Sequence, residues 1–262
     1  MMKTIGFLGC GNMGGAIARA VCKATEPENV FLANRTAAKA EALAAELGCQ
    51  TATNAEVAGN CDLIFLAVKP QMMEAMLEPL RFILAERTKR FVLCTMAAGL
   101  PVARIQEMAG GDYPVIRIMP NTPVAIGQGV ISLARSQVVT DQQVAKVNQL
   151  LSGAGALYEI EEKLMDPATA VAGCGPAFVY QMIEAMADAG VSLGLTREQA
   201  LQMAAQTFQG ASQMVLETGE HPARLRDAVC SPGGSTILGV NRLEQVGLRG
   251  DIIAGVEAAY KR

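Results

Sequence analysis

The sequence is poor in the residues on which many catalytic and metal-binding sites depend. Histidine occurs once, at His221, and the seven cysteines are scattered without a Cys-x-x-Cys pair. We therefore expect no metal site, because metal centres rely on clusters of such ligands. An odd number of unpaired cysteines is typical of reduced thiols in a cytoplasmic protein.

A basic excess and long apolar segments are missing as well. The net charge of −3 offers no positive field for nucleic acid. No apolar run reaches the length of a membrane span, and the first residues lead into a predicted strand rather than into a signal peptide. We expect a cytoplasmic protein that binds neither nucleic acid nor a membrane.

Hydrophobic residues, in contrast, make up 51% of the 262 residues. Such a high share favours a parallel sheet that is buried on both faces, together with a second buried surface such as a subunit interface. The length suits one large domain or two domains of ordinary size.

The stretch from Ile5 to Ile17 carries the strongest local pattern. A short apolar run ends in Gly9-Cys10-Gly11-Asn12-Met13-Gly14, and an alanine-rich helical pattern follows at once. This spacing indicates the strand, turn and helix of a dinucleotide-binding unit. Gly9 allows the tight turn, Gly11 lets a pyrophosphate approach the backbone, and Gly14 lets the helix pack close to the strand.

The next predicted strand, residues 30–33, ends in Asn34-Arg35-Thr36. An NAD-binding protein usually has an acidic residue here, which bonds the ribose 2′-hydroxyl. The acid is missing; Arg35 offers a planar donor pair for a phosphate, and Asn34 and Thr36 can donate hydrogen bonds. The segment predicts the 2′-phosphate of NADP as ligand, so NADPH is the expected cofactor and NADH the alternative.

Further strands are predicted at 49–52, 62–68, 91–94, 115–119, 129–133 and 157–160, with a helical stretch at 71–84. Capping-box sequences at Thr53–Glu56 and Thr140–Gln143 predict helix starts. Loops that follow strand C-termini line the ligand crevice of a doubly wound sheet, where Asn121 and Thr122 could orient a nicotinamide. The expected cofactor contacts are Gly9, Gly11, Asn12, Met13, Gly14, Asn34, Arg35, Thr36, Asn54, Ala67, Val68, Lys69, Pro70, Ala97, Met119, Pro120 and Asn121.

Strand patterns stop after residue 160. We expect an α/β first domain of residues 1–160, a Rossmann-type doubly wound sheet, and an all-helical second domain of residues 161–262. The helix predicted from Gly175 to Gly190 has only a narrow polar stripe and should be buried on most sides. Thr196–Gln199 predicts the start of another long helix. Such apolar helices are expected to pair with a second copy, as a dimer or a larger assembly.

One loop of the second half combines glycines with hydroxyl groups. It is Ser231-Pro232-Gly233-Gly234-Ser235-Thr236, and a helix is predicted to begin after it, near Ile237. Free N–H groups at a helix N-terminus make this a candidate site for a small carboxylate. The alternative is an ordinary N-cap loop.

Several motifs together resemble those of pyrroline-5-carboxylate reductases. They are the Gly9–Gly14 turn, Ala67-Val68-Lys69-Pro70, Met119-Pro120-Asn121-Thr122-Pro123, Gly173-Cys174-Gly175-Pro176-Ala177-Phe178, and the segment from Asp227 to Thr236. The first motif is shared with many reductases, whereas the last three in combination are specific. The resemblance spans essentially the whole chain; small departures occur at Cys174 and Ser235.

The resemblance implies reduction of 1-pyrroline-5-carboxylate to L-proline by NADPH or NADH, the last step of proline biosynthesis. It implies a helical domain that forms a homodimer by interleaving, with dimers often gathered into a decamer. The loop at 231–236 is then expected to complete an active site with the nucleotide domain of the partner chain. The implied substrate contacts are Glu162, Ser231, Gly233, Gly234, Ser235 and Thr236, and Thr236, which contacts the ring nitrogen, is the implied catalytic residue.

Two other functions stay open at this point. A β-hydroxyacid dehydrogenase would need a catalytic lysine in a helix of the second domain, and no lysine occurs between Gly175 and Thr218. A non-catalytic NADPH-sensing module would not need the loop at 231–236. The lack of a suitable histidine favours the imine, because a protonated imine accepts hydride without the base that alcohol oxidation requires.

Overall fold

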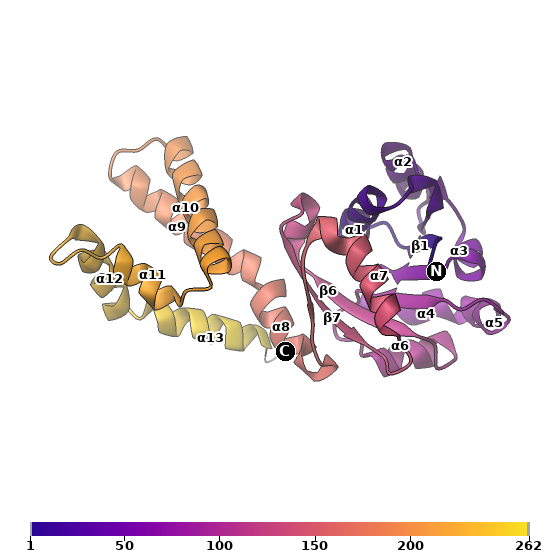
Figure 1. Ribbon diagram of the computed structural model, residues 1–262. Coiled ribbons are helices and arrows are strands. Elements are labelled where there is room, and N and C mark those ends of the chain that lie inside the picture. Colours follow the sequence, from indigo (N-terminus) through magenta and orange to yellow (C-terminus); the bar gives the residue numbers. More distant parts are fainter. Residues whose placement is uncertain (1, 261–262) are drawn as a thin grey trace. The chain divides into compact units, whose positions relative to one another are not determined.

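The computed structural model describes residues 2–260, which divide into two compact units, with the boundary in the sequence between Gly173 and Cys174. The first unit contains an eight-stranded sheet with helices on both faces, and the second consists of helices (Figure 1). Across residues 2–260 no helix combines the length and the apolar character that a membrane span requires.

The sheet has the strand order β3-β2-β1-β4-β5-β6-β7-β8. Its strands are β1 Ile5–Leu8, β2 Val30–Ala33, β3 Gln50–Thr51, β4 Leu63–Leu66, β5 Val92–Thr95, β6 Val115–Pro120, β7 Gly129–Arg135 and β8 Gly155–Glu159. The order reverses direction beside β1, so the predicted doubly wound sheet is confirmed.

One strand pair departs from the parallel pattern. All neighbouring strands pair in parallel except β6 and β7, which are antiparallel with Ile118 opposite Leu133. The reason is the short connection between Pro120 and Gly129, which holds only the 3₁₀ turn η4 (Thr122–Ile126). A parallel return needs a crossover of a dozen residues or more, roughly a helix in length.

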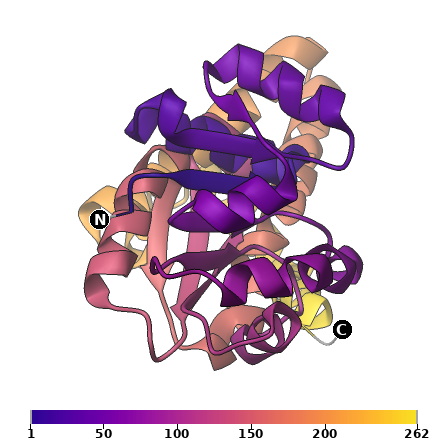
Figure 2. The same ribbon diagram turned by 90° about the vertical axis from the view of Figure 1, so that its right-hand side faces the viewer.

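Helices cover the two faces of the sheet separately, as the views in Figures 1 and 2 show. Successive residues of a strand point to opposite faces of the sheet, so each face has its own hydrophobic core. On one face Phe7 and Phe65 stack with ring centroids 4.6 Å apart, whereas Ile64 and Leu66 point into the core on the other face. The first face is covered by α1 Asn12–Ala24, α2 Ala37–Leu47 and α7 Asp141–Leu151, the second by α3 Asn54–Asn60, α4 Met73–Leu77, α5 Arg81–Ala85 and α6 Val102–Ala109.

Local sequence rules explain where most of these helices begin and end. The predicted capping boxes of α3 and α7 are formed at Thr53 and Thr140. The helix α2 ends at Gly48, which adopts a left-handed conformation. The helical stretch predicted at 71–84 is instead broken into η2 Pro70–Met72, α4, η3 Glu78–Leu80 and α5. Pro79 explains the break, because it lacks the N–H that a continuous helix needs.

The segment after β8 is packed onto the sheet and belongs to the first compact unit. It contains η6 Glu162–Leu164, α8 Met165–Ala168 and the π-turn η7 Thr169–Gly173. Arg117 of β6, which is 4% exposed, lies 3.3 Å from Glu162 (Nη1 to Oε1) and 3.6 Å from Asp166 (Nη2 to Oδ1). The compact unit thus extends beyond residue 160; the functional division at 160 stays a prediction.

The second unit is formed by α9 Gly175–Ser192, α10 Arg197–Thr218, α11 Pro222–Ala228, α12 Ser235–Gln245 and α13 Leu248–Tyr260. Within one chain α9 fully buries only Ala187, so the predicted burial of this helix is not reached by a single chain. Large apolar side chains such as Tyr180, Met203 and Leu216 are more than half exposed. Apolar helices left open in this way require a further surface to cover them.

Arg117 provides a test of how the segment after β8 is held. Replacing Arg117 with Met should lower the free energy of unfolding by about 1–3 kcal/mol, because Glu162 and Asp166 lose their cation. Chemical denaturation at fixed protomer concentration measures this change. The matched control is Arg19→Met, which removes the exposed pair with Glu46 and should cost less than about 1 kcal/mol. Equal losses in the two variants would contradict the anchoring role.

Candidate functional site

The glycine turn after β1 brings the helix α1 against the sheet. Gly9 has a φ of 111°, which favours glycine, and a Cβ at this position would lie 2.6 Å from the carbonyl oxygen of Ala67. A Cβ on Gly14 would lie 2.5 Å from the carbonyl oxygen of Gly9, whereas one on Gly11 would meet nothing within 4 Å. The space beside Gly11 is therefore open at the N-terminus of α1, where backbone N–H groups favour an anion.

Asn34 fixes this turn to the end of β2. Its side-chain oxygen accepts the N–H of Cys10 at 3.0 Å, and its amide nitrogen donates to the carbonyl of Thr36 at 2.9 Å. The predicted role of Asn34 as a phosphate donor thus competes with two bonds to the protein backbone. Thr36 stands at the N-cap of α2 but forms no capping bond with its side chain.

A cavity of about 700 Å³ opens beside the ends of β2 and β3. Asn34 and Arg35, predicted from the segment after β2, and Asn54, predicted from a separate part of the sequence, all line it. The cavity also contains apolar surface from Pro79, Leu80 and Ile83. A flat ring could pack on that surface while Arg35 meets a phosphate, which suits the adenosine end of a dinucleotide.

The other predicted cofactor contacts follow strands that run parallel to β1. Ala67, Val68, Lys69 and Pro70 follow β4, and Ala97 follows β5. Met119 and Pro120 end β6, and Asn121 follows it. Because the carboxyl ends of parallel strands meet at one edge of a sheet, the structure brings these residues to the edge that holds the glycine turn. Of this set Lys69 is exposed and Ala97 is buried.

Asn121 is buried and holds two segments together. Its side-chain oxygen accepts the N–H of Val130 at 2.9 Å, and its amide nitrogen donates to the carbonyl of Ala172 at 3.0 Å. The amide is thus bound to β7 and to the segment after β8. Contact between Asn121 and a nicotinamide stays a prediction, and the bonds observed are structural.

Glu162 likewise forms hydrogen bonds within the chain, all through one of its two carboxylate oxygens. Its Oε1 accepts the N–H of Val102 at 2.7 Å as well as the guanidinium of Arg117 at 3.3 Å. The second oxygen, Oε2, remains as the group that could meet a substrate. Sequence reasoning missed Arg117 as a site-forming residue; the signal was a single charge within the otherwise apolar run of residues 115–119.

The loop at 231–236 lies in the second unit and ends at the start of α12. The helix begins at Ser235 rather than near Ile237 as predicted, with Gly234 as N-cap in extended conformation. Gly233 has a φ of 71°, and the N–H of Gly234 donates to the carbonyl of Ser231 at 3.0 Å. Ser235 and Thr236 therefore occupy the first turn of an 11-residue helix, where N–H groups have no partner within the helix.

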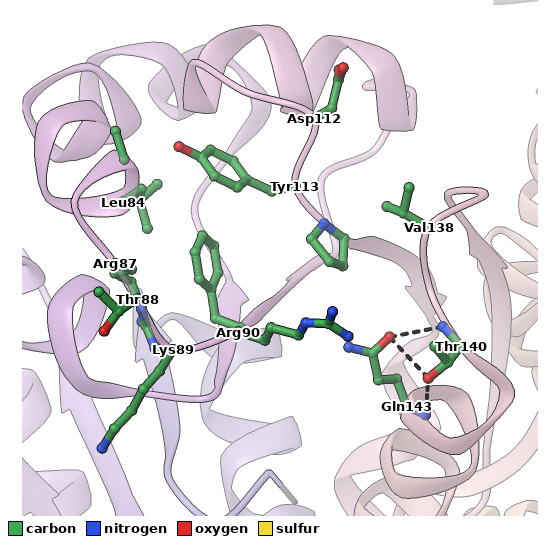
Figure 3. Close-up of a pocket in the computed structure, with 13 residues that line it drawn as sticks. Leu84, Arg87, Thr88, Lys89, Arg90, Asp112, Tyr113, Val138, Thr140 and Gln143 are labelled. Carbon is green, nitrogen blue, oxygen red and sulfur yellow. Dashed lines mark hydrogen bonds between the residues drawn. The ribbon is translucent and has the colours of Figure 1, made fainter.

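A cavity of about 420 Å³ at the opposite edge contains none of the predicted site residues. Figure 3 shows Arg90 extending toward Gln143, whose side chain is bonded to Thr140 in the capping box of α7. Arg87 donates to the carbonyls of Ala58 and Cys61 and stacks on the ring of Phe91. This cavity lies beside the amino ends of β5 and β6, away from the glycine turn.

The cysteine thiols are unpaired, and burial changes the acidity of some of them. All seven cysteines are free, and burial raises the pKa of Cys10 to about 11 and of Cys22 to about 12. Both are therefore neutral near pH 7. Within the part of the chain that the structure describes, no group of three or more His, Cys, Asp or Glu side chains is arranged to hold a metal ion.

Comparisons with known proteins match the whole chain. Residues 162–262 match the family described as pyrroline-5-carboxylate reductase dimerisation, and residues 4–98 match the family described as NADP oxidoreductase, coenzyme F420-dependent. The pyrroline-5-carboxylate reductase of Escherichia coli is 40% identical over 100% of this chain and 97% of its own length. The chain belongs to the pyrroline-5-carboxylate reductase family.

Solved structures of family members agree in fold. The pyrroline-5-carboxylate reductase of Coxiella burnetii superimposes with a TM-score of 0.93 at 30% identity, over 100% of this chain and 97% of that chain. The enzyme of Plasmodium falciparum, solved with NADP bound, gives a TM-score of 0.86 at 33% identity over the same shares of the two chains. The expected fold, a Rossmann-type sheet followed by a helical dimerisation domain, is confirmed.

The glycine turn of this reductase-family chain also fits the cofactor. At Gly9 and Gly14 a side chain would collide with backbone atoms, whereas at Gly11 it would enter the open space at the helix start. This is the arrangement expected if a pyrophosphate occupies the position that a Cβ on Gly11 would fill.

Substitutions at Gly11 and Gly14 are therefore expected to have different effects. Gly11→Ala should leave the melting temperature close to that of the wild type but weaken NADPH binding by roughly tenfold or more, because the Cβ takes the ligand's space. Gly14→Ala should weaken binding and also lower stability by about 1–3 kcal/mol through overpacking. Calorimetric titration and thermal unfolding measure both effects, and NADPH binding of wild-type strength in Gly11→Ala would refute the assignment.

Proposed function

We propose that the chain reduces 1-pyrroline-5-carboxylate to L-proline, the last step of proline biosynthesis, with NADPH as the preferred and NADH as the alternative cofactor. The observation that carries the proposal is similarity over the full length to reductases of this name. The glycine turn at the carboxyl edge of the sheet supports the cofactor. The alternatives, a β-hydroxyacid dehydrogenase and an NADPH-sensing module, have no comparable support.

The nucleotide would be held along the carboxyl edge of the sheet. We propose that the first turn of α1, at Asn12, Met13 and Gly14, binds the pyrophosphate, and that Arg35 binds the 2′-phosphate. The residues after β4, β5 and β6 are the proposed contacts of the nicotinamide end. When bound, the reduced nicotinamide supplies the hydride.

The substrate carboxylate would be held by the loop at 231–236. Backbone N–H groups of Ser235 and Thr236 stand at the N-terminus of α12, which favours a negative charge, whereas the N–H of Gly234 donates to Ser231 and Gly234 contributes the extended N-cap. The hydroxyl of Thr236 is proposed to orient the ring nitrogen, with Ser231 and Gly233 shaping the loop and Oε2 of Glu162 as a further contact. The expectation that this loop meets the nucleotide domain of the partner chain stays a prediction.

No general base is required of the protein in this reaction. The substrate is a cyclic imine whose nitrogen can arrive protonated, and its carbon then accepts hydride directly. The single histidine is consistent with a reaction that needs no general base. His221 is the N-cap of α11, and its Nδ1 accepts the N–H of Ala223 at 3.2 Å. The protein contributes position and charge.

Residues 162–262 match the family described as pyrroline-5-carboxylate reductase dimerisation, which supports assembly through this part of the chain. We propose a homodimer that gathers into a decamer, and a cytoplasmic location. The exposed apolar residues of α9 and α10 support the dimer, because a single chain leaves them in contact with water. We also propose residues 1–160 as the nucleotide-binding part and residues 161–262 as the dimerisation and substrate-binding part.

Thr236 offers the direct test of the substrate site. Thr236→Ala should lower kcat/KM for the imine by roughly tenfold to a hundredfold, because a hydrogen bond to a charged group is lost. Thr236→Ser, which keeps the hydroxyl, should retain most of the activity. The measurement is the loss of absorbance as NADPH is oxidised in the presence of pyrroline-5-carboxylate; full turnover in Thr236→Ala would remove the proposed role.

Arg35 tests the choice between the two cofactors. Arg35→Gln should raise the KM for NADPH by about tenfold or more while changing the KM for NADH little, because only NADPH has the 2′-phosphate that the guanidinium binds. Steady-state kinetics with each cofactor at saturating imine measures the two constants. Equal changes for both cofactors would show that Arg35 does not read the 2′-phosphate.

A further inference from the structure

The cavity lined by Arg35 holds charges of both signs. Its charged lining residues are one cation, Arg35, and two carboxylates, Glu41 and Glu56. An acid is missing from the position directly after β2 where NAD-binding proteins usually have one. The tertiary structure nevertheless supplies acids to the same cavity, from α2 and from α3.

The two carboxylates differ in how they are held. Glu56 is turned back onto the start of α3, where Oε2 accepts the N–H of Thr53 at 2.7 Å and its hydroxyl at 2.9 Å. These two bonds, the backbone one first, lower the pKa of Glu56, which therefore stays ionised near neutral pH. The Oε2 atom of Glu56 is therefore occupied by the capping box.

Glu41 is held by no such arrangement. It lies on α2 together with Ala37 and Ala40, and these three residues, spaced i, i+3 and i+4, form the face of the helix that lines the cavity. Among residues 2–260 no basic side chain lies within ion-pair distance of its carboxylate. Its exposed charge therefore acts on whatever enters the cavity.

We infer that Glu41 determines cofactor specificity in opposition to Arg35, by repelling the 2′-phosphate of NADPH and accepting a hydrogen bond from the ribose hydroxyls of NADH. The inference rests on the proposed function only in placing the adenosine end of the cofactor in this cavity. Arg35 and Glu41 then act on the same group with opposite sign. The preference for NADPH that the residues after β2 suggest is reduced accordingly.

Fragments of the two cofactors test this directly, without catalysis. Isothermal titration with 2′,5′-ADP and with 5′-AMP compares the adenosine end with and without the 2′-phosphate. Glu41→Gln should tighten 2′,5′-ADP relative to 5′-AMP on the order of three- to tenfold, as expected for removing a like charge across a solvated cavity. Glu41→Asp should restore part of the wild-type ratio, and added salt should shrink the effect.

Glu46 provides the matched control. It is an exposed glutamate on the same helix, it pairs with Arg19 at 2.7 Å, and it does not line the cavity. Glu46→Gln should leave the ratio of the two dissociation constants at the wild-type value. A ratio that stays unchanged in Glu41→Gln, or that moves equally in Glu46→Gln, would overturn the assignment to Glu41.

Kinetics separate this inference from the proposed function. In an active enzyme, Glu41→Gln should raise kcat/KM for NADPH relative to NADH by the same factor as in the titration, mainly through KM. If the wild-type protein oxidises no cofactor with the imine, the proposed function fails while the titration still decides the role of Glu41. If it turns over and the cofactor ratio does not respond to Glu41→Gln, the inference fails alone.

Discussion

The contact between helix α1 and the turn after β1 is the constraint on which the rest of the nucleotide-binding unit depends. A Cβ on Gly14 would lie 2.5 Å from the carbonyl of Gly9 and 2.9 Å from the Cβ of Ala67, so β1, β4 and α1 meet without an intervening side chain. This close packing places the free N–H groups at the start of α1 beside the carboxyl ends of the parallel strands. Every other proposed cofactor contact is arranged along that edge.

Around this contact, polar side chains are used to fix backbone segments to one another. Asn34 joins the glycine turn to β2, Asn121 joins β7 to the segment after β8, and Glu162 joins that segment to the start of α6. The buried amide of Asn121 needs such partners, because leaving it without them would cost free energy, whereas Asn34 and Glu162 are only partly buried. These residues can therefore serve the site by holding its loops in place, even where they do not contact the ligand.

The helical unit follows a different rule. Its long helices obey the local signals in the sequence, yet one chain leaves much of their apolar surface exposed. The matching dimerisation family explains this surface as an interface between copies. The loop at 231–236, the proposed substrate site, lies in the same unit and leads into α12.

The sequence by itself determined the features that arise within a few neighbouring residues. Local rules predicted the glycine turn and the capping boxes at Thr53, Thr140 and Thr196. The strands were predicted for the same reason, because buried parallel strands read as short apolar runs. Only the tertiary structure decided that Asn34 and Asn121 bond to backbone partners and that Glu41 and Arg35 line one cavity. Each of these joins elements or side chains whose mutual distance is set by how strands and helices pack, and no local pattern in a chain encodes that distance.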